Sequence, residues 1–392
     1  MKGSGSYVLW LPSWYPNELE PYNGDFIQRH AKAAALYMRI EVLHVIKDEE
    51  GRITKDVLTR VKEDGLLRET IIYYYQPSSN ARLFNKYKSW KKYSTLYKNK
   101  IRELFMMEGK PKLVNVYIAL KAGLVARWIR KEFRVDYVVS EQWTIYLKEA
   151  RPNFSSLSPY FQYLCKKIFA DAEDVMAVSK YLGSALQNRF DISEPTVIPN
   201  VVDNEIFNYD QRKRKFENRF IHISTLVFQK NFNDILRAFQ IVDQRGFNFS
   251  LDVIGPNIES LTSLVKACHL QEKITFHGEM GQAALSEYIK RADALILYSR
   301  YETFGCVLIE ANSCGVPVIV SDIPVMHENV TNRINGLFVK QTNPEALAEI
   351  IISFLHKKYA FNARQIAKYA SDHYSYQSVG LRFWRWYVSL EK

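Results

Sequence analysis

The sequence predicts an α/β protein built from two doubly wound, parallel-sheet domains. Its 392 residues are too many for one compact hydrophobic core and suit two domains of roughly 150–200 residues each. Short runs of β-branched and aromatic residues alternate with longer segments that repeat apolar residues every three or four positions. This alternation occurs in two successive series. Strands that alternate with helices form parallel sheets covered by helices on both faces, so each series predicts one such domain.

Each series contains short apolar runs that are expected to form its strands. In the first series these runs span residues 7–11, 40–46, 113–116, 136–140, 174–178 and 195–198. In the second series they span residues 220–224, 250–254, 274–277, 294–298, 316–321 and 336–339. Between the strands of the second series, helical periodicity is clearest over residues 231–244, 258–269 and 344–357.

We expect a first domain over residues 1–203 and a second over residues 204–375. The two series separate near residues 199–216, where the charged stretch QRKRK at 211–215 suits a linker. A last helical pattern lies within residues 376–392, and it either packs within the second domain or crosses back onto the first. Its aromatic side chains are Phe383, Trp384, Trp386 and Tyr387.

The positive charge of the chain is concentrated in one segment. The sequence has 53 Lys and Arg against 42 Asp and Glu, a formal net charge of +11. Residues 1–200 hold 31 basic and 22 acidic side chains, whereas residues 201–392 hold 22 and 20. Residues 82–112 alone carry ten basic side chains against Glu103 and Glu108. The excess is therefore a local basic patch and not a property of the whole chain.

The cysteines and the hydropathy pattern favour a cytoplasmic protein. The four cysteines lie far apart, without the spacing of a disulfide framework or a zinc site. No stretch approaches the roughly 18–20 apolar residues of a membrane-spanning helix. The opening MKGSGS and the short run YVLWLP that follows it lack the length and the cleavage site of a signal peptide.

The densest chemical signal is the segment YSRYETFGCVLIEANSCGVP at residues 298–317. A strand ends there, a polar turn follows, and a helix is expected to start near Gly305 and to stop before Pro317. A helix that opens with glycine exposes free amides and its positive dipole end, which suits a phosphate group. Glu302 and Glu310 lie eight residues apart, so their carboxylates reach different parts of one ligand. Carboxylates beside a phosphate site serve as hydroxyl acceptors, and a sugar nucleotide carries hydroxyls on both its ribose and its sugar.

This segment resembles the E-x7-E signature of the retaining glycosyltransferases of family 4, the glycosyl transferases group 1, which have the GT-B fold of two Rossmann-like domains facing a cleft. The resemblance covers nearly the whole chain and is most specific in the second domain. Other passages that resemble the family are PSWYP at 12–16, Asn23, Gly24 and Phe26, SEQW at 140–143, Ser179, PNVVD at 199–203, Phe207, the stretch 222–239, DVIG at 252–255, FHG at 276–278, residues 322–328 and NGL at 335–337.

The resemblance implies three catalytic roles. Lys230 would neutralise the leaving diphosphate, and a lone lysine after a strand, facing a helix N-terminus, suits that task as a point charge. Glu302 would bind hydroxyls of the donor sugar, and Glu310 would bind the ribose of the nucleotide.

The resemblance also implies a set of binding residues. Gly24 would let the first loop approach the donor closely, because it lacks a Cβ, although a plain turn glycine is the alternative. The donor-binding residues implied are Gly24, Thr225, Gly255 and the phosphate-capping Thr303, Phe304, Gly305 and Cys306. On the acceptor side, the resemblance implies Gln142 and Asn115.

Three positions depart from the family pattern. Thr225 stands where a diphosphate-binding arginine is expected, so Lys230 and the helix end carry more of the charge or another basic residue substitutes. Gln142 stands where many relatives have histidine, and an amide donates and accepts hydrogen bonds but does not shuttle protons. The passage VNVY at 114–117 replaces a common histidine-containing one, which affects donor or acceptor choice.

Taken together, the resemblance implies a retaining, metal-independent transfer of a sugar from a nucleotide-diphosphate sugar to a glycan or lipid-linked acceptor, in the synthesis of surface polysaccharide. No cofactor and no metal site are expected. Two alternatives stay open: an epimerase of the same fold, which forms product without an acceptor, and a protein that binds the nucleotide sugar without turnover.

The basic segment 82–112 has two main interpretations. Aromatic and apolar residues recur in it near helical spacing, with lysines between them. Either its rings belong to the core and its lysines are solvated, or it contacts the headgroups of an anionic membrane. A basic nucleic-acid-binding protein is the last alternative, and against it no nucleic-acid-binding module is recognisable, so no nucleic-acid partner is expected. The rings and aliphatic residues concerned are Tyr87, Trp90, Tyr97, Ile101, Leu104 and Phe105.

Overall fold

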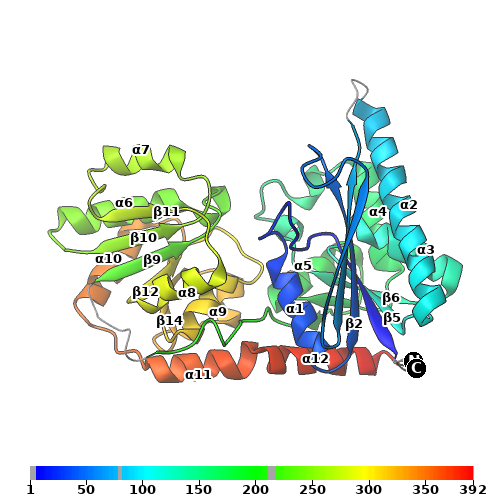
Figure 1. The fold of residues 1–392 in the computed structure, drawn as a ribbon. Coiled ribbons are helices and arrows are strands. Elements are labelled where there is room, and N and C mark those ends of the chain that lie inside the picture. Colours follow the sequence, from blue (N-terminus) through cyan, green and yellow to red (C-terminus); the bar gives the residue numbers. More distant parts are fainter. Residues whose placement is uncertain (1–5, 78–81, 211–217, 392) are drawn as a thin grey trace.

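The computed structural model describes residues 6–77, 82–210 and 218–391, so the expected linker stretch 211–215 lies outside the described residues. Two α/β halves lie side by side (Figure 1). Each is built on its own sheet, of eight strands in the N-terminal half and six in the C-terminal half. Helices cover both faces of the sheets, as the strand–helix alternation predicts.

The N-terminal sheet has the strand order β3-β4-β2-β1-β5-β6-β7-β8, and all neighbours except β3 and β4 are parallel. Its central strand β1 is fully buried because helices cover both faces. Leu9 and Leu11 point into one core, and Val8 and Trp10 into the other. The strands are β1 (Tyr7–Pro12), β2 (Arg39–Asp48), β3 (Val57–Asp64), β4 (Leu67–Tyr75), β5 (Leu113–Tyr117), β6 (Tyr137–Glu141), β7 (Val175–Ala177) and β8 (Thr196–Val197).

The sequence predicted a wholly parallel first sheet and did not predict the antiparallel hairpin β3–β4. β3 is exposed along most of its length, so it lacks the apolar run used to find the other strands. The residues Gly65 and Leu66 form a two-residue turn between its end and β4. Gly65 has a φ of 58°, and an Asp-Gly pair between two extended runs was the available signal.

The helices of the N-terminal half pack on the two faces of this sheet. Rings of α2 and α3 belong to the same core as Leu9, whereas α1 packs with Trp10 on the opposite face. The helices are α1 (Asp25–Ala35), α2 (Arg82–Glu108), α3 (Ala122–Phe133), α4 (Pro159–Ala170) and α5 (Lys180–Phe190), with short 3-10 turns η1 (Thr144–Tyr146) and η2 (Phe154–Ser156).

The C-terminal sheet is parallel throughout, in the order β11-β10-β9-β12-β13-β14, and it contains all six strands expected there. In such a sheet, ligands bind at the carboxyl ends of the strands. The strands are β9 (Arg219–Ile223), β10 (Ser250–Ile254), β11 (Ile274–His277), β12 (Ala294–Leu297), β13 (Val318–Ser321) and β14 (Gly336–Val339). The helices are α6 (Phe232–Gln244), α7 (Glu259–Ala267), α8 (Gln282–Lys290), α9 (Cys306–Ser313), α10 (Pro344–Leu355) and α11 (Ala363–Tyr374), with 3-10 turns η4 (Phe228–Lys230) and η5 (Pro324–Glu328).

The chain passes between the halves twice. After α11 it returns as α12 (Tyr376–Ser389), which runs along the N-terminal half against α1 (Figure 1). The ring of Phe383 lies 5.5 Å from that of Trp10, centroid to centroid, and Trp386 Nε1 donates to Asp174 at 2.6 Å. The two connecting segments are bonded to each other: the amide of Val202, in the first, donates to the carbonyl of Tyr374, in the second, at 2.8 Å.

A close helix crossing holds α12 on α1. A β-carbon at Gly380 would lie 2.1 Å from the carbonyl oxygen of Ala33, which is far inside van der Waals contact. We therefore expect Gly380→Ala to lower the free energy of unfolding by about 2 kcal/mol, because the two helices must separate. Urea unfolding measures this. Gly278→Ala, at a glycine with no atom within 4 Å of its added carbon, is the matched control. Equal midpoints for the two variants would contradict the crossing.

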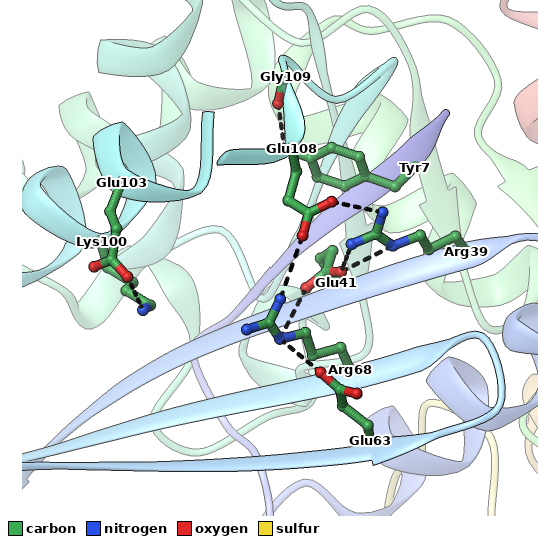
Figure 2. Close-up of polar contacts among 9 residues, drawn as sticks. All are labelled: Tyr7, Arg39, Glu41, Glu63, Arg68, Lys100, Glu103, Glu108 and Gly109. Carbon is green, nitrogen blue, oxygen red and sulfur yellow. Dashed lines mark hydrogen bonds and ion pairs between the residues drawn. The ribbon is translucent and has the colours of Figure 1, made fainter. Parts of the chain in front are cut away.

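The basic helix α2 is anchored through its inner face and its C-terminus. Tyr97 and Ile101 are fully buried, so these two apolar residues belong to the core as the first interpretation expects, whereas the ring of Tyr87 is exposed. At the C-terminus, Glu108 accepts a hydrogen bond from Arg39 at 3.0 Å and lies 3.7 Å from Arg68 (Figure 2). The same arginines pair with Glu41 and Glu63 on β2 and β3. Over the described ranges, no helix has both the length and the apolar character needed to cross a membrane.

Candidate functional site

A cavity of about 400 Å³ lies between the two halves. Asp25, Phe26 and Arg29 of α1 line it from the N-terminal half, and loops at the carboxyl ends of the C-terminal strands line it from the other half. Ten of the twelve residues expected from the sequence are in its lining. These are Lys230, Glu302, Glu310, Thr225, Gly255, Thr303, Phe304, Gly305, Cys306 and Gln142.

The N-terminus of α9 opens onto this cavity. Gly305 precedes the helix with a φ of 91°, a conformation that favours glycine, and the carbonyl of Gly305 accepts the amide of Leu308 at 3.0 Å. Helical residues begin at Cys306, next to the expected start. The first amides of a helix have no partner within it, so they are donors available to an anion.

Lys230 and Glu302 form an ion pair in the cavity lining. Lys230 ends the short turn η4 after β9, and Glu302 lies in the loop after β12, so neighbouring strands bring them together across 72 positions. Glu302 is buried, and it also accepts hydrogen bonds from the hydroxyl of Ser299 at 2.8 Å and from the amide of Gln229 at 3.2 Å. The pair places one positive charge and one multiply held carboxylate on the same wall.

Arg29 joins Glu310 across the two halves. Its Nη1 lies 2.7 Å from Glu310 Oε1, and its Nη2 lies 3.1 Å from Asp25, which also accepts from Gln282 at 3.1 Å. The side chains of Arg29 and Glu310 are each only 5% exposed. Burial raises the pKa of Glu310, and the guanidinium of Arg29 partly offsets this effect. Arg29 stays charged, because its two carboxylate partners outweigh the effect of burial on its pKa.

Sequence reasoning missed Arg29. It lies in an ordinary amphipathic helix, 281 positions from Glu310, and no local spacing marks it. Its Nε is buried without a hydrogen-bond partner among the described residues, while the rest of the guanidinium is held by Asp25 and Glu310. Arg29 is thus a basic residue in the cavity lining where Thr225 leaves the expected arginine missing.

Gly255 allows two loops of the C-terminal half to touch. A β-carbon there would lie 1.8 Å from the carbonyl oxygen of Ser224, and its φ is 148°. Ser224 is fixed in turn by His222, whose Nε2 lies 2.8 Å from the hydroxyl. Burial lowers the pKa of His222 to about 4. The glycine therefore brings Ser224 and Thr225 close to the end of β10, at the floor of the cavity.

On the N-terminal side, Gln142 is oriented by a buried histidine. His30 Nε2 lies 2.9 Å from the carbonyl of Pro199, and its Nδ1 lies 3.3 Å from Gln142 Nε2 and 3.1 Å from the Tyr117 hydroxyl. A carbonyl only accepts, so Nε2 carries the proton and Nδ1 accepts. Burial lowers the pKa of His30 to about 3, so the ring is neutral. Gln142 therefore donates to His30, in agreement with a hydrogen-bonding role.

A buried carboxylate holds the loop that carries Gln142. Glu141 is fully buried and accepts from the amide of Ala119 at 2.8 Å, the hydroxyl of Tyr146 at 2.9 Å and the amide of Gln142 at 3.1 Å. Burial raises its pKa to about 7, against the hydrogen bonds, which lower it. Glu141 fixes the entrance of the loop and does not line the cavity.

Gly24 and Asn115 lie outside the cavity lining. Gly24 caps α1 with a φ of 76°, and a β-carbon there would lie 2.7 Å from the backbone of Trp14, so the local turn alone requires glycine. Asn115 is fully buried, where it donates to the Tyr387 hydroxyl at 2.7 Å and accepts from Ser140 at 2.8 Å. Its contacts tie β5 to α12, and it does not reach the acceptor side of the cavity.

Over the described ranges, no three His, Cys, Asp or Glu side chains are grouped so that they could hold a metal ion.

Comparison with known proteins finds a family match over the C-terminal half. Residues 203–373 match the family model described as glycosyl transferases group 1. Among curated relatives, the chain is 29% identical over 178 residues to the O-antigen chain mannosyltransferase RfbU of Salmonella typhimurium, covering 44% of this chain and 49% of that one. It is 28% identical over 165 residues to N-acetyl-alpha-D-glucosaminyl L-malate synthase of Bacillus anthracis, covering 40% and 43%. The chain thus spans less than half the length of these two relatives.

The whole fold is matched by solved structures. Sucrose-phosphate synthase from Thermosynechococcus elongatus has a TM-score of 0.76 at 17% identity, covering 98% of this chain and 99% of that one. HepE of Anabaena, in complex with UDP-glucose, has a TM-score of 0.70 at 16% identity, covering 98% and 99%. These likenesses show the fold. The chain therefore has the GT-B fold, and its residues 203–373 match the family model of the glycosyl transferases group 1.

Proposed function

We propose that this protein is a retaining, metal-independent glycosyltransferase that moves a sugar from a nucleotide-diphosphate sugar to a glycan or lipid-linked acceptor. The observation that carries the proposal is the cavity between the halves, which brings together Lys230, Glu302, Glu310 and the open end of α9. A phosphate, a sugar and a ribose each find matching groups in this one space.

The donor is bound mainly by the C-terminal half. The amides at the start of α9 and the ammonium of Lys230 hold the diphosphate. Glu302 accepts from hydroxyls of the sugar, and Glu310 accepts from the ribose while Arg29 keeps it charged. Two solved GT-B structures support a nucleotide donor by their bound ligands, HepE with UDP-glucose and starch synthase IV of Arabidopsis thaliana with ADP and acarbose.

Catalysis consists of positioning and charge stabilisation. The bond between the anomeric carbon and the diphosphate breaks, and the acceptor oxygen bonds to the same face of that carbon, so configuration is retained. The proton of the acceptor hydroxyl goes to a phosphate oxygen of the donor. Lys230 and the α9 amides stabilise the negative charge that develops on the leaving diphosphate. No step in this sequence requires a proton from a protein side chain.

The acceptor binds on the N-terminal side, where Gln142 faces the donor across the cavity. Curated relatives include RfbU and the amylovoran biosynthesis glycosyltransferase AmsD of Erwinia amylovora, which supports a role in assembling surface polysaccharide. We propose that the protein acts in the cytoplasm.

One screen tests this function. Release of nucleoside diphosphate is measured across UDP-, GDP- and ADP-sugars, with and without glycan and lipid-linked acceptors. We expect release with one donor, stimulated by an acceptor, and a product of retained configuration by NMR. A new sugar formed without acceptor would show an epimerase, and nucleotide binding without turnover would show a binding protein. Either result would overturn the proposal.

We further propose that α2 rests on the anionic inner face of the cytoplasmic membrane. Its inner rings belong to the core, so the contact is electrostatic, through exposed groups such as Lys86, Tyr87 and Lys91. Reversing the charge of Lys86 and Lys91 to glutamate is expected to weaken binding to vesicles with anionic phospholipid by at least about thirtyfold, because each lysine lost costs about 1 kcal/mol and each glutamate adds repulsion.

Vesicle sedimentation at low and high salt measures this binding. Changing Lys357 and Lys358 to glutamate, at exposed positions after α10, makes the same charge change on the other half and is the control. If both double variants bind as tightly as the wild type, α2 is a solvated surface helix.

A further inference from the structure

A second cavity, of about 530 Å³, lies within the N-terminal half, apart from the donor residues. The loop after β6 forms one wall, and α4 and α5 form the others. Tyr146, Leu147 and Phe154 contribute apolar surface, and Gln162, Ser184 and Asn188 contribute polar groups. The space is large enough for one sugar ring or a phosphorylated headgroup.

The charge of this cavity is uniformly positive. Lys148, Lys166 and Arg189 line it, and none of the described residues in its lining is acidic. Lys148 lies 3.7 Å from Glu149, which also accepts from the Tyr181 hydroxyl at 2.9 Å. Within the described residues, no carboxylate lies within 4 Å of the charged groups of Lys166 or Arg189. Three like charges around one space repel one another, and an anion between them relieves that repulsion.

The guanidinium of Arg189 lies against an aromatic ring in the wall of this cavity. Its guanidinium lies 5.1 Å from the centre of the Phe154 ring, which fixes the plane of the group on the cavity wall. Its Nε is buried and has no hydrogen-bond partner in the described part of the chain. The guanidinium therefore offers its other N–H groups, and not its Nε, to a ligand in the cavity that it lines.

We propose that this cavity binds a phosphate group attached to an organic body, either a soluble sugar phosphate or a lipid headgroup. Arg189 and Lys166 hold the phosphate oxygens, and Ser184 and Asn188 bond to the hydroxyls of the organic body. The role of this group as part of the acceptor rests on the proposed glycosyl transfer, whereas the binding itself does not.

Lys166 and Lys167 offer a matched pair of variants. Both are exposed lysines on α4, but only Lys166 lines the cavity, whereas Lys167 lies 5.7 Å from the ring of Tyr163. Binding of glucose 1-phosphate and of dioctanoyl phosphatidic acid is measured by calorimetry. Lys166→Gln and Arg189→Gln are expected to weaken binding of at least one probe about tenfold each, and Lys167→Gln to leave it unchanged.

The two probes distinguish the sources, since the tighter one identifies a sugar phosphate or a lipid headgroup. Repeating the titration in Lys230→Ala separates this cavity from the donor site, because binding here is expected to persist when donor turnover is lost. The proposal is overturned if the wild type binds neither probe at millimolar concentration, or if Lys166→Gln and Lys167→Gln bind alike.

Discussion

Replacing Lys230 by alanine is expected to lower the turnover number on the order of 10²–10³-fold, the effect of removing one group that stabilises a developing anion. Lys230 is the one residue of the expected diphosphate site that supplies a full positive charge, since Thr225 replaces the arginine. The loss should fall mainly on the turnover number, because the charge on the diphosphate grows as the glycosidic bond breaks.

The measurement is nucleoside diphosphate release with the donor found by the screen. Lys273→Ala is the control, because Lys273 forms a comparable ion pair, 2.5 Å from Asp243, outside the cavity lining. Glu302→Gln should keep the fold and lose turnover as well, since Ser299 and Gln229 still bond to the amide. Turnover near the wild-type value in Lys230→Ala would refute the assignment of this residue.

The second large effect is expected at the pair formed by Arg29 and Glu310. Arg29→Met leaves Glu310 buried without its partner, which should lower the free energy of unfolding by about 3 kcal/mol. Glu310→Gln should cost less stability, because Asp25 still pairs with Arg29. The double variant should be more stable than the sum of the two losses predicts, with a coupling above about 1 kcal/mol.

Activity separates the two roles of Glu310. The double variant recovers stability but lacks the carboxylate for the ribose, so its Michaelis constant for the donor should stay high. Denaturant unfolding and donor kinetics on the four proteins of the cycle measure both quantities. Additive stability losses would show that the two side chains do not interact, and normal donor kinetics in Glu310→Gln would remove its assigned role.

The local motifs were predictable from the sequence because their chemistry is local. The turn and helix around Glu302 and Gly305 are fixed by a polar turn, a glycine and a stop signal within twenty positions, and they lie where expected. The same holds for the other strands with buried apolar runs, except β4, which is largely buried and was nevertheless not expected. The exposed strand β3 was missed because burial, which the apolar runs report, is absent there.

Contacts between distant segments could not be predicted in this way. Arg29 meets Glu310 only because α1 faces α9 across the cavity, and nothing within a few residues of Arg29 records that. Asn115 was expected at the acceptor, yet α12 covers it with Tyr387. Which side chains meet across the fold depends on how the two halves and the last helix pack together. That packing involves the whole structure, so no short stretch of sequence reports it.

The double crossing of the chain has a mechanical consequence. A GT-B protein joined by one strand of chain could swivel in any direction, whereas two connections restrict the halves to rotation about the line through both. Here the two connections are joined by the hydrogen bond from Val202 to Tyr374, so together they form one short hinge between the halves. A rotation of one half against the other would then turn about this single axis, and the distance of Arg29 and Glu310 from the axis would decide how far they separate for a given angle.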